Sequence, residues 1–358
     1  MKVAIIGAGV AGLSCAHELE KHGIRPVIYE QNSFIGEQHP HVAAILEIIY
    51  RPIKNPVEHF KKNLGIDIKP LNTINSIIHY SPNKRTEIKG NLGYLFKRDK
   101  TPDDLKNQIY SKLKKTKVLF NEYGDYDKLS KKYDYVVIAT GNTNFTRELG
   151  CWTGWLNTYV RGAVVLGDFD PNTLVVWLDK SYCKNGYAYL TPFDDKRATL
   201  ALVVPEVNEK EVDSFWELFW NTEDIKYAIV EEFKLNHKSG HVYPHKIGNI
   251  YLAGDAGGVI DPFLGFGLMN SIAMGVLAAR SIAQGKDYEK LIQEMMKYNL
   301  RMHEFRKSFD ILDNTGYDFL FSALGLPGFK NLLYYSPLNV AKYGYYLLKL
   351  VPKKKKKF

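Results

Sequence analysis

Three glycines near the start of the chain have the spacing that phosphate binding requires. Gly7, Gly9 and Gly12 form G-x-G-x-x-G between an apolar run, Val3–Ile6, and a stretch with helical spacing, Val10–Lys21. In such a turn the first glycine permits a tight bend, the second admits a diphosphate, and the third lets helix and strand pack closely. The diphosphate then lies at the positive end of the helix. The spacing predicts a dinucleotide-binding turn; the alternative is an ordinary strand-to-helix turn.

A carboxylate follows at the distance expected for ribose recognition. Glu30 lies eighteen residues after Gly12 and ends the apolar run Pro26–Tyr29. A carboxylate in this place accepts hydrogen bonds from ribose hydroxyls. Strand, glycine turn, helix, second strand and acid therefore agree on one nucleotide-binding unit.

A second glycine-rich segment follows more than two hundred residues later. The strand-like run Asn249–Leu252 leads into Gly254-Asp255 and then into Pro262-x-x-Gly265-x-Gly267, before a helix. A carboxylate at a strand end can hold a ribityl hydroxyl, and backbone N–H groups at a helix N-terminus stabilise the anionic pyrimidine side of a reduced flavin. The two segments together favour FAD. The alternative is a glycine-rich turn before a core helix.

The elements around these motifs predict an α/β fold built from two sheets. A Rossmann-like FAD-binding domain in discontinuous pieces is expected to hold the parallel sheet, and an inserted antiparallel β-sheet domain to bind substrate. A short helix over Val42–Tyr50, a helix over Thr101–Lys114 and a hairpin around Ser81–Lys84 are also expected. The expected boundaries are 1–75, 93–155 and 240–310 for the first domain, 76–92 and 156–239 for the second, and 311–358 for a helical, basic C-terminal region.

Over residues 1–310 the chain resembles the FAD-dependent oxidoreductases of the para-hydroxybenzoate hydroxylase fold, and most of all their geranylgeranyl reductase branch. The resemblance rests on the two glycine segments with Glu30, and on Gly93-Tyr-Leu-Phe-Lys-Arg98 before a helix. It implies FAD as cofactor, with Arg98 at the diphosphate or adenosine; a solvated strand end is the alternative for Arg98. The implied FAD-binding residues are Gly7, Gly9, Ala11, Gly12, Glu30, Gln31, Arg98, Thr140, Gly141, Gly254, Asp255, Pro262, Gly265, Phe266 and Gly267.

The substrate motif of these reductases is matched only in part. Tyr187-Ala-Tyr189-Leu-Thr191-Pro192 is similar to their aromatic-x-Trp-x-Phe-Pro segment, which implies substrate contacts for Tyr187, Tyr189 and Pro192. Tyr189 stands in place of the Trp and Thr191 in place of the Phe, and the glycines expected after Pro192 are missing. The lining of the substrate cavity is therefore expected to differ.

Two further departures concern the electron donor and the proton donor. Hydroxylases of this fold carry Asp-Gly where this chain has Thr140-Gly141, and that Asp serves both FAD and NADPH. With one nucleotide fingerprint, the chain is expected to take electrons from an external donor, reduced ferredoxin or NAD(P)H. The cysteine that many reductases carry near the flavin is absent from Gly36–Ala44. His39 and His41 lie there as candidate proton donors, or as loop histidines that face water.

Composition sets limits on the other classes of function. Hydrophobic residues make up 45% of the 358 residues, which is ordinary for a globular protein. The three cysteines have no C-x-x-C spacing, and His241 with His245 lacks further ligands, so no metal site is expected. No run of eighteen apolar residues is present, so we expect no membrane span and a cytoplasmic protein.

The positive charge belongs to the tail. Of the net charge of +9, residues 319–358 carry +8 through eight lysines and no acids, which leaves +1 for the rest and argues against nucleic acid as a partner. A helix over 338–351 would have one narrow polar stripe, the pattern of a peripheral helix in the headgroup region. Lys353–Lys357 would attract an anionic membrane surface. The alternative is a final helix packed on the protein's own core.

These observations favour an FAD enzyme that reduces C=C bonds of an isoprenoid or similar lipophilic substrate. One alternative is a flavin monooxygenase acting on an aromatic or lipophilic substrate. A second alternative is a non-catalytic flavoprotein or lipid carrier at a membrane surface.

Overall fold

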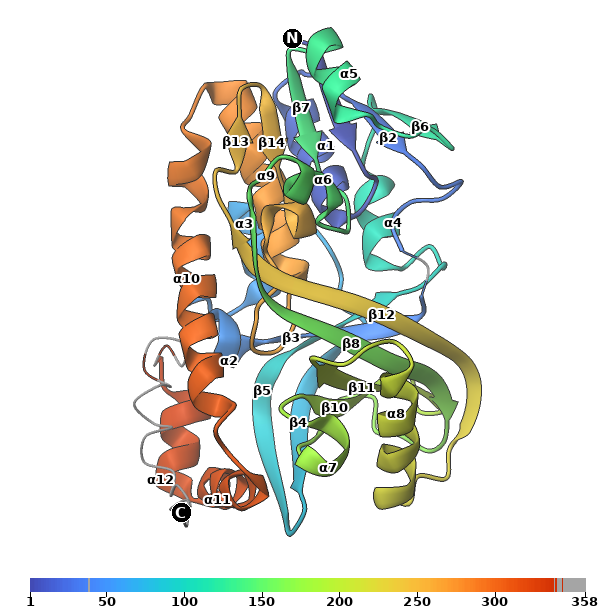
Figure 1. The fold of residues 1–358 in the computed structure, drawn as a ribbon, viewed down its shortest axis with the longest axis vertical. Coiled ribbons are helices and arrows are strands. Elements are labelled where there is room, and N and C mark those ends of the chain that lie inside the picture. The colour runs from blue at the N-terminus through green and yellow to red at the C-terminus, as the bar shows by residue number, and fades with distance from the viewer. Residues whose placement is uncertain (38, 338, 340–342, 344–358) are drawn as a thin grey trace.

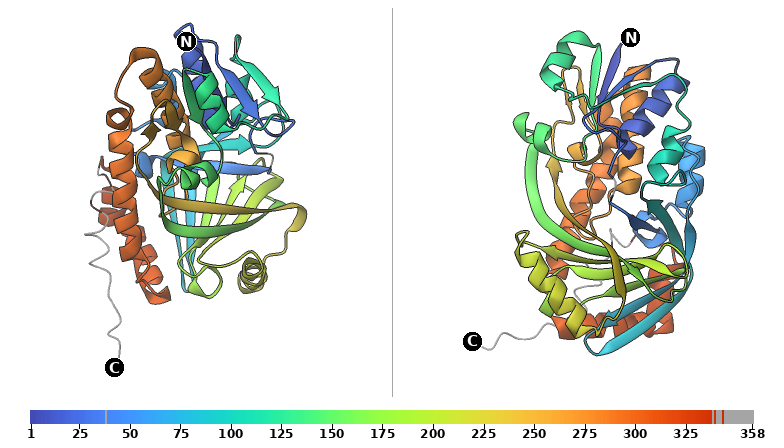
Figure 2. Two further views of the ribbon diagram at one scale, coloured as in Figure 1. Left: turned by 45° about the horizontal axis from the view of Figure 1, so that its top comes forward. Right: turned by 90° about the vertical axis from the view of Figure 1, so that its right-hand side faces the viewer.

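The computed structural model describes residues 1–37, 39–337, 339 and 343 (Figure 1). Two sheets lie at opposite ends of the molecule, and the long helix α10 (Tyr288–Phe309) runs beside both. The smaller sheet carries the chain's N-terminus, and the larger sheet curves across the other end (Figures 1 and 2). The expected α/β fold class, with a Rossmann-like sheet, an antiparallel sheet and C-terminal helices, is confirmed.

The first sheet is parallel except at one edge, where β13 and β14 run antiparallel. Its central strands are the short apolar runs of the sequence, and they are apolar throughout because both faces of the sheet are covered. The register places Ile5 beside Ile28 on one side and Val137 on the other. The strands are, in spatial order, β13 (Lys246–Ile247), β14 (Ile250–Leu252), β7 (Tyr135–Ile138), β1 (Val3–Ile6), β2 (Val27–Glu30) and β6 (Lys117–Phe120).

Helices cover both faces of this sheet. One core cluster joins the sheet to α1 and α9, and another joins it to α5 and α6. Asp104 caps α4 and Asp125 caps α5, each accepting hydrogen bonds from two backbone N–H groups. The helices of this part are α1 (Val10–Lys21), α2 (Glu47–Tyr50), α3 (Pro56–Asn63), α4 (Leu105–Tyr110), α5 (Tyr126–Lys132), α6 (Asn144–Glu148), the 3-10 turn η1 (Gly254–Gly257) and α9 (Leu268–Gln284).

The second sheet has eight strands, antiparallel apart from the parallel pair β4 and β9. One face packs against α7 (Lys180–Cys183) and α8 (Glu211–Thr222), and the other faces α10 and the C-terminal helices. In spatial order the strands are β12 (Ala228–Val242), β8 (Trp152–Leu166), β11 (Arg197–Pro205), β10 (Tyr187–Pro192), β9 (Thr173–Trp177), β4 (Asn72–Ser81), β5 (Lys84–Arg98) and β3 (His41–Leu46).

The C-terminal elements close over the second sheet. They are α11 (Asn314–Gly325), α12 (Pro327–Lys330) and the π-helical turn η2 (Asn331–Tyr335). Arg51 fastens η2 by donating hydrogen bonds to the carbonyl oxygens of Leu333 and Tyr334. The hydroxyl of Tyr334 lies 3.1 Å from Nε2 of His79 on β4. The last turn of the described chain is thus tied to residues more than two hundred positions earlier.

Two local expectations from the sequence differ from the structure, and a third is not tested by it. The expected helix over 42–50 is a strand, β3, as far as Leu46 and becomes helical only from Glu47, because Val42–Leu46 pairs with β5. The expected helix over 101–114 is helical only over α4, since Asp104 and not Pro102 begins it. Most of the expected tail helix, 338–351, lies outside the described residues.

The expected domain boundaries stay a prediction, although two strands bear on them. Both β3 and the last six residues of β5 fall within ranges expected for the FAD-binding domain, yet they pair in the eight-stranded sheet. The chain therefore enters the second sheet as early as His41.

Two helices far apart in sequence touch at their backbones. A methyl group added at Gly275 of α9 would lie 2.1 Å from the carbonyl oxygen of Ala11 in α1. A methyl group at Gly254 would likewise lie 2.8 Å from the Ala11 side chain. Side chains larger than hydrogen are excluded at both points. The N-terminal glycine turn is therefore held directly against the segment that begins at Gly254.

Replacing Gly275 with alanine should destabilise the protein. Alanine normally favours a helix interior, but here its methyl group would collide with backbone, so we expect a loss of roughly 1–3 kcal/mol in the free energy of unfolding. Urea unfolding would measure it. Gly328→Ala is the matched control because no atom of the described residues lies within 4 Å of a methyl group added there. Equal stability of the two variants would contradict the close helix contact.

Candidate functional site

The glycine turn has the shape that a diphosphate needs. Gly7 has a φ of +104°, and methyl groups at Gly7 and Gly12 would lie 2.7 Å from the Ala139 carbonyl oxygen and 2.0 Å from the Gly7 carbonyl oxygen. Around Gly9, by contrast, no atom of the described residues lies within 4 Å of an added methyl group. Gly9 is also the N-cap of α1, with no side-chain cap hydrogen bond. Open space therefore adjoins the helix N-terminus where the sequence predicted the ligand.

Glu30 lies at the end of β2, beside this turn. It is buried, and its Oε2 accepts a hydrogen bond of 2.8 Å from the backbone N–H of Ala8. Its Oε1 accepts from both the backbone and the side-chain nitrogen of Asn32, each at 2.9 Å. A carboxylate has further lone pairs for a ribose hydroxyl. The neighbouring Gln31 is exposed. The predicted roles of Glu30 and Gln31 in binding FAD stay predictions.

The predicted flavin-facing carboxylate lies on η1, immediately after β14. Burial raises the pKa of Asp255 to about 6, and the negative charge of Glu37 acts in the same direction, while Arg98 opposes them. A carboxyl group of this kind gains most from a hydroxyl partner, such as one on a ribityl chain. Thr140 and Gly141 follow β7 on the other side of Gly7, with Cα of Thr140 3.3 Å from an added Gly7 methyl group.

The Pro262–Gly267 turn is shaped by Asp261. Its Oδ1 accepts hydrogen bonds from the backbone N–H groups of Phe263 and Leu264, at 2.6 and 2.9 Å. Gly265 has a φ of +73°, and Gly267 is the N-cap of α9 without a side-chain cap hydrogen bond. The turn therefore offers a second uncapped helix N-terminus. Its distance from the first is set by the contact between α1 and α9.

Tyr187 and Tyr189 bring the second sheet to this turn. The hydroxyl of Tyr187 donates a hydrogen bond to the carbonyl oxygen of Leu264, and the ring centres of the two tyrosines are 5.9 Å apart. Burial raises the pKa of Tyr189 to about 12. Both tyrosines line the cavity described below, whereas Pro192, at the end of β10, is buried and does not line it.

A charged cluster lies beside the two turns. Glu37 forms an ion pair with Arg98, the predicted diphosphate ligand. Burial by itself would raise the pKa of Glu37, but the charges of Arg98, His41, His237 and Lys106 hold it below its usual value. Arg98 thus lies near the predicted FAD site, with a carboxylate partner that the sequence analysis did not identify.

The two candidate histidines differ in their exposure to solvent. His39 is exposed, while His41 is buried and lines the cavity. Burial, with Arg98 nearby, lowers the pKa of His41 to about 4, and its Nδ1 lies 2.9 Å from the carbonyl oxygen of His39. A further imidazole, His237 on β12, has Nδ1 3.8 Å from an added Gly265 methyl group. Its pKa is also lowered by burial.

A cavity of about 560 Å³ extends from the Pro262–Gly267 turn to the C-terminal helices. Its walls are mostly apolar side chains from the second sheet, including β3, and from α10, α11 and η2. Polar groups gather at the turn, where His41, Arg98 and His237 lie, and His79 lies beside η2. The volume and lining suit a long apolar molecule.

Sequence reasoning did not find Glu37, His237 or the contribution of α11 and η2 to the cavity. Glu37 and His237 belong to no motif, and only the pairing of β12 with β8 brings His237 to the turn. The apolar residues of α11 are visible in the sequence as a run of Phe, Tyr and Leu. The sequence pattern predicts a helical, basic C-terminal region there, but it does not indicate that these residues line the cavity.

Other types of site find no support in the described part of the chain. No group of three metal-ligating side chains lies together there. The three cysteines are buried and unpaired, and burial raises the pKa of Cys15 far above its usual range. No described helix is both long and apolar enough to cross a membrane.

Comparisons with known proteins show which proteins this chain is similar to. Residues 1–151 match the family described as pyridine nucleotide-disulphide oxidoreductase. Digeranylgeranylglycerophospholipid reductase 1 of Methanococcoides burtonii is 22% identical over 328 residues, covering 82% of this chain and 78% of that protein. A geranylgeranyl bacteriochlorophyll reductase-like protein of Thermoplasma acidophilum has a similar structure, with a TM-score of 0.73, 17% identity, and coverage of 96% of this chain and 98% of that one.

Oxygenases share the same fold. The p-nitrophenol 4-monooxygenase PnpA of Pseudomonas putida has a TM-score of 0.64 at 15% identity, with coverage of 99% of this chain and 98% of that one. The resemblance to the reductase-like branch of the hydroxylase fold is confirmed, and so is the cofactor. The chain is an FAD-dependent oxidoreductase, and the non-catalytic alternative is set aside.

A side chain at Gly9 should block the cofactor without harming the fold. The position has ordinary backbone angles and open space, so Gly9→Leu should fold normally while its side chain fills the room left for the diphosphate. We expect loss of flavin absorbance from the purified protein, with apoprotein melting unchanged. Gly328→Leu, equally unobstructed, should retain the flavin. A Gly9→Leu protein with full flavin content would show that the diphosphate binds elsewhere.

Asp261 gives a prediction for pH dependence. Burial raises its pKa from 3.8 to about 6, against the opposing hydrogen bonds of Leu264 and Phe263. Because the folded state holds the proton more tightly, this group stabilises the protein below about pH 4 and loses that contribution as the pH rises through about 6. Asp261→Asn lacks this titration but keeps the acceptor.

The free energy of unfolding of Asp261→Asn minus that of wild type should therefore increase by roughly 1–3 kcal/mol as the pH rises from about 4 to about 7.5. Urea unfolding at several pH values would measure it. A difference between the two proteins that does not change with pH would contradict the assignment.

Proposed function

We propose that this protein is a reductase that transfers a hydride, through FAD, to a C=C bond of an isoprenoid or similar lipophilic substrate. The observation that carries the proposal is the apolar cavity of about 560 Å³ that begins at the Pro262–Gly267 turn. This cavity continues from the turn to the C-terminal helices, which gives room for a long apolar chain. The similarity to a digeranylgeranylglycerophospholipid reductase supports the same substrate class.

The residues present suit FAD along its whole length. The open space at Gly9 and the N-terminus of α1 would take the diphosphate, Glu30 the adenosine ribose, and Asp255 the ribityl chain. The Pro262–Gly267 turn and the N-terminus of α9 would hold the pyrimidine edge, with Phe266 and Ala11 beside them. Reduced FAD supplies the hydride.

The cavity would then position one double bond and keep water out. Its apolar walls, including Tyr187 and Tyr189, would hold the chain of the substrate. A saturated product also needs a proton on the second carbon. His41 and His237 are the imidazoles of the cavity wall near the turn, and both are largely neutral at neutral pH, because burial lowers their pKa values. A neutral imidazole would first have to accept a proton from solvent, and the imidazolium formed in this way would donate that proton to the carbon.

The electron donor is proposed to be external, either reduced ferredoxin or NAD(P)H. The described chain has one glycine fingerprint, and Thr140-Gly141 lacks the carboxylate that hydroxylases of this fold use for NADPH. Mixing the oxidised protein with each donor in turn, and following flavin absorbance, would identify which of them reduces it.

An anionic membrane surface is the proposed source of the substrate. The lysines at 353–357 would be attracted to acidic headgroups, and the segment 338–351 would lie at the interface. Both segments fall mainly outside the described residues. Their contribution can be measured by the loss of liposome binding when 338–358 is removed.

Anaerobic single turnover tests the central proposal. Dithionite-reduced protein, mixed with a detergent-solubilised polyprenyl lipid without oxygen, should be reoxidised and should yield a product with one more saturated bond. If the flavin is reoxidised only when oxygen is added and the product gains an oxygen atom, the protein is a monooxygenase. The experiment has to distinguish this outcome because the p-nitrophenol monooxygenase has the same fold.

A cavity-filling substitution should separate chain binding from flavin chemistry. Val176 lines the cavity, so Val176→Trp should slow reoxidation by a long-chain lipid at least about tenfold, while flavin content stays unchanged. Val230→Trp, at an exposed position on β12, is the control and should leave the rate unaltered. Equal rates in both variants would mean that the lipid chain does not occupy this cavity.

A further inference from the structure

The cavity reaches the surface among the C-terminal helices. Phe319 and Leu326 both line it, and they are also 44% and 61% exposed to solvent. Along η2, Leu333 and Tyr334 line the cavity, whereas Leu332 and Tyr335, on either side of them, are exposed. Four exposed apolar side chains, those of Phe319, Leu326, Leu332 and Tyr335, thus lie on the helices that form the end of the cavity away from the flavin turn, and we call them the apolar rim.

A basic hairpin tip is fixed to this rim. Asp318 of α11 accepts hydrogen bonds from Ser81 Oγ at 2.6 Å and from the backbone and side chain of Asn83 at 3.1 and 2.8 Å. Thr86 donates to the Phe321 carbonyl oxygen at 2.7 Å, and the Tyr335 hydroxyl donates to that of Lys89. The β4–β5 hairpin and the rim are therefore one rigid unit.

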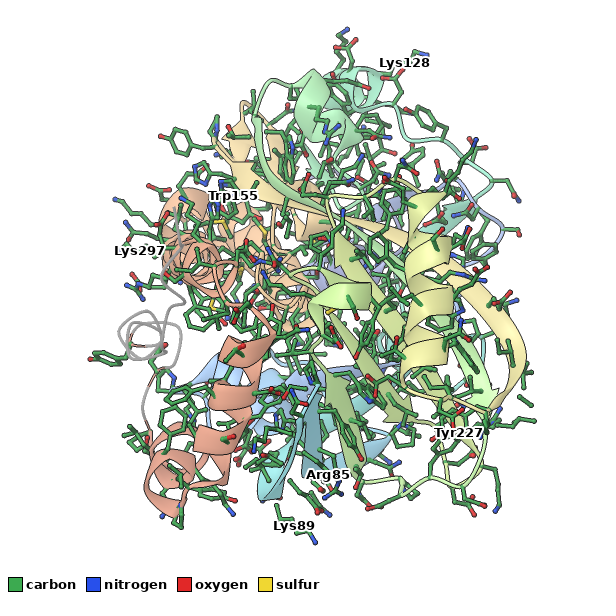
Figure 3. All side chains as sticks on the ribbon, turned by 60° about the horizontal axis from the view of Figure 1, so that its bottom comes forward. Arg85, Lys89, Lys128, Trp155, Tyr227 and Lys297 are labelled. Carbon is green, nitrogen blue, oxygen red and sulfur yellow. The ribbon has the colours of Figure 1, made fainter. Side chains whose placement is uncertain are left out.

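The tip presents cations around the apolar rim. Lys84, Arg85 and Lys89 are all exposed, and Lys330 lies 5.8 Å from the centre of the Tyr335 ring. Three acids adjoin them: Glu87, which contacts Arg85 and Lys89 at 3.7 and 3.4 Å, Asp318, which holds the hairpin, and Asp170, which lies within electrostatic range of Lys89. The balance remains positive. Arg85 and Lys89 lie at one end of the molecule and Lys128 at the other (Figure 3).

We propose that this hairpin–rim face docks on the surface of an anionic lipid bilayer, with the apolar rim in the headgroup region and the cavity mouth open toward the acyl chains. Exposed apolar side chains beside lysine and arginine are the chemistry of an interfacial contact. The chain beyond the rim adds lysines and no acids, since residues 336–358 carry seven lysines and no Asp or Glu. A protein partner would need acidic groups against the same cations and an apolar surface against the rim.

The inference that the cavity mouth admits lipid from the bilayer rests on the proposed function, because only an enzyme that consumes lipid needs such an entrance. Docking itself can be measured without turnover. Full-length protein should co-sediment with vesicles of phosphatidylcholine and phosphatidylglycerol at about 3:1, and much less with phosphatidylcholine alone. The triple variant K84E/R85E/K89E should bind the acidic vesicles at least about tenfold more weakly. Leu326→Ser with Leu332→Ser should weaken binding even at high salt, where charge is screened.

The matched control is K128E/K131E/K132E on α5, which changes net charge equally at the opposite end. Docking by this face predicts vesicle binding close to wild type for the control. Equal losses in both triple variants would overturn the proposal, because binding would then depend on net charge alone. Failure of the wild-type protein to bind acidic vesicles would also overturn the proposal. So would self-association of the wild-type protein in sedimentation velocity, if Leu326→Ser with Leu332→Ser abolished it, because the face would then be an interface between copies of the chain.

Turnover separates this proposal from the function itself. With detergent-solubilised lipid, the hairpin variant should be reoxidised at the wild-type rate, and with vesicle-borne lipid more slowly. Absence of lipid-driven reoxidation in wild type, together with normal vesicle binding, would remove the reductase proposal and leave the docking face standing. Equal rates for both variants on vesicle-borne lipid would show that the hairpin does not deliver the substrate.

Discussion

The contact between the backbones of α1 and α9 is the constraint on which the site depends. Ala11 meets Gly275 and Gly254 so closely that neither glycine can carry a side chain. The glycine turn at residues 7–12 and the turn at 262–267 precede these two helices, so their separation is set by a contact between main chains. A cofactor that spans both turns needs such a fixed distance. If the two turns moved relative to each other, they would have to be ordered each time the cofactor bound, which would reduce the binding free energy.

The two ends of the cavity have opposite character, and this division follows from the fold. Near the flavin turn the wall comes from β3, β5 and β12, which bring His41, Arg98 and His237 to Glu37. At the far end, the wall comes from α11 and η2 and is almost wholly apolar. A substrate with a long hydrocarbon chain is thereby offered most of the charged and titratable groups where chemistry is proposed to occur, while His79 lies at the far end.

Much of the cofactor site could be predicted from the sequence because short motifs determine it. Gly7, Gly9 and Gly12 with Glu30 lie within one strand–helix–strand unit, and Gly254-Asp255 ends another strand. Glu37 and His237 could not be found in this way, since long-range strand pairing alone brings them together. The strand at 42–46 was predicted as helix because its partner, β5, is fifty residues away in the chain. Local propensity is overridden there by pairing.

The hydrogen bonds from Arg51 to Leu333 and Tyr334 have a consequence for how the protein is made. The cavity's outer wall is supplied by α11 and η2, so a nascent chain emerging from the ribosome has its apolar interior uncovered until the residues up to Tyr335 have been synthesised. Synthesis of this segment is then the event that closes the cavity. A chain cut short before residue 314 would leave that interior exposed to water and to other nascent chains, and would be expected to aggregate rather than persist.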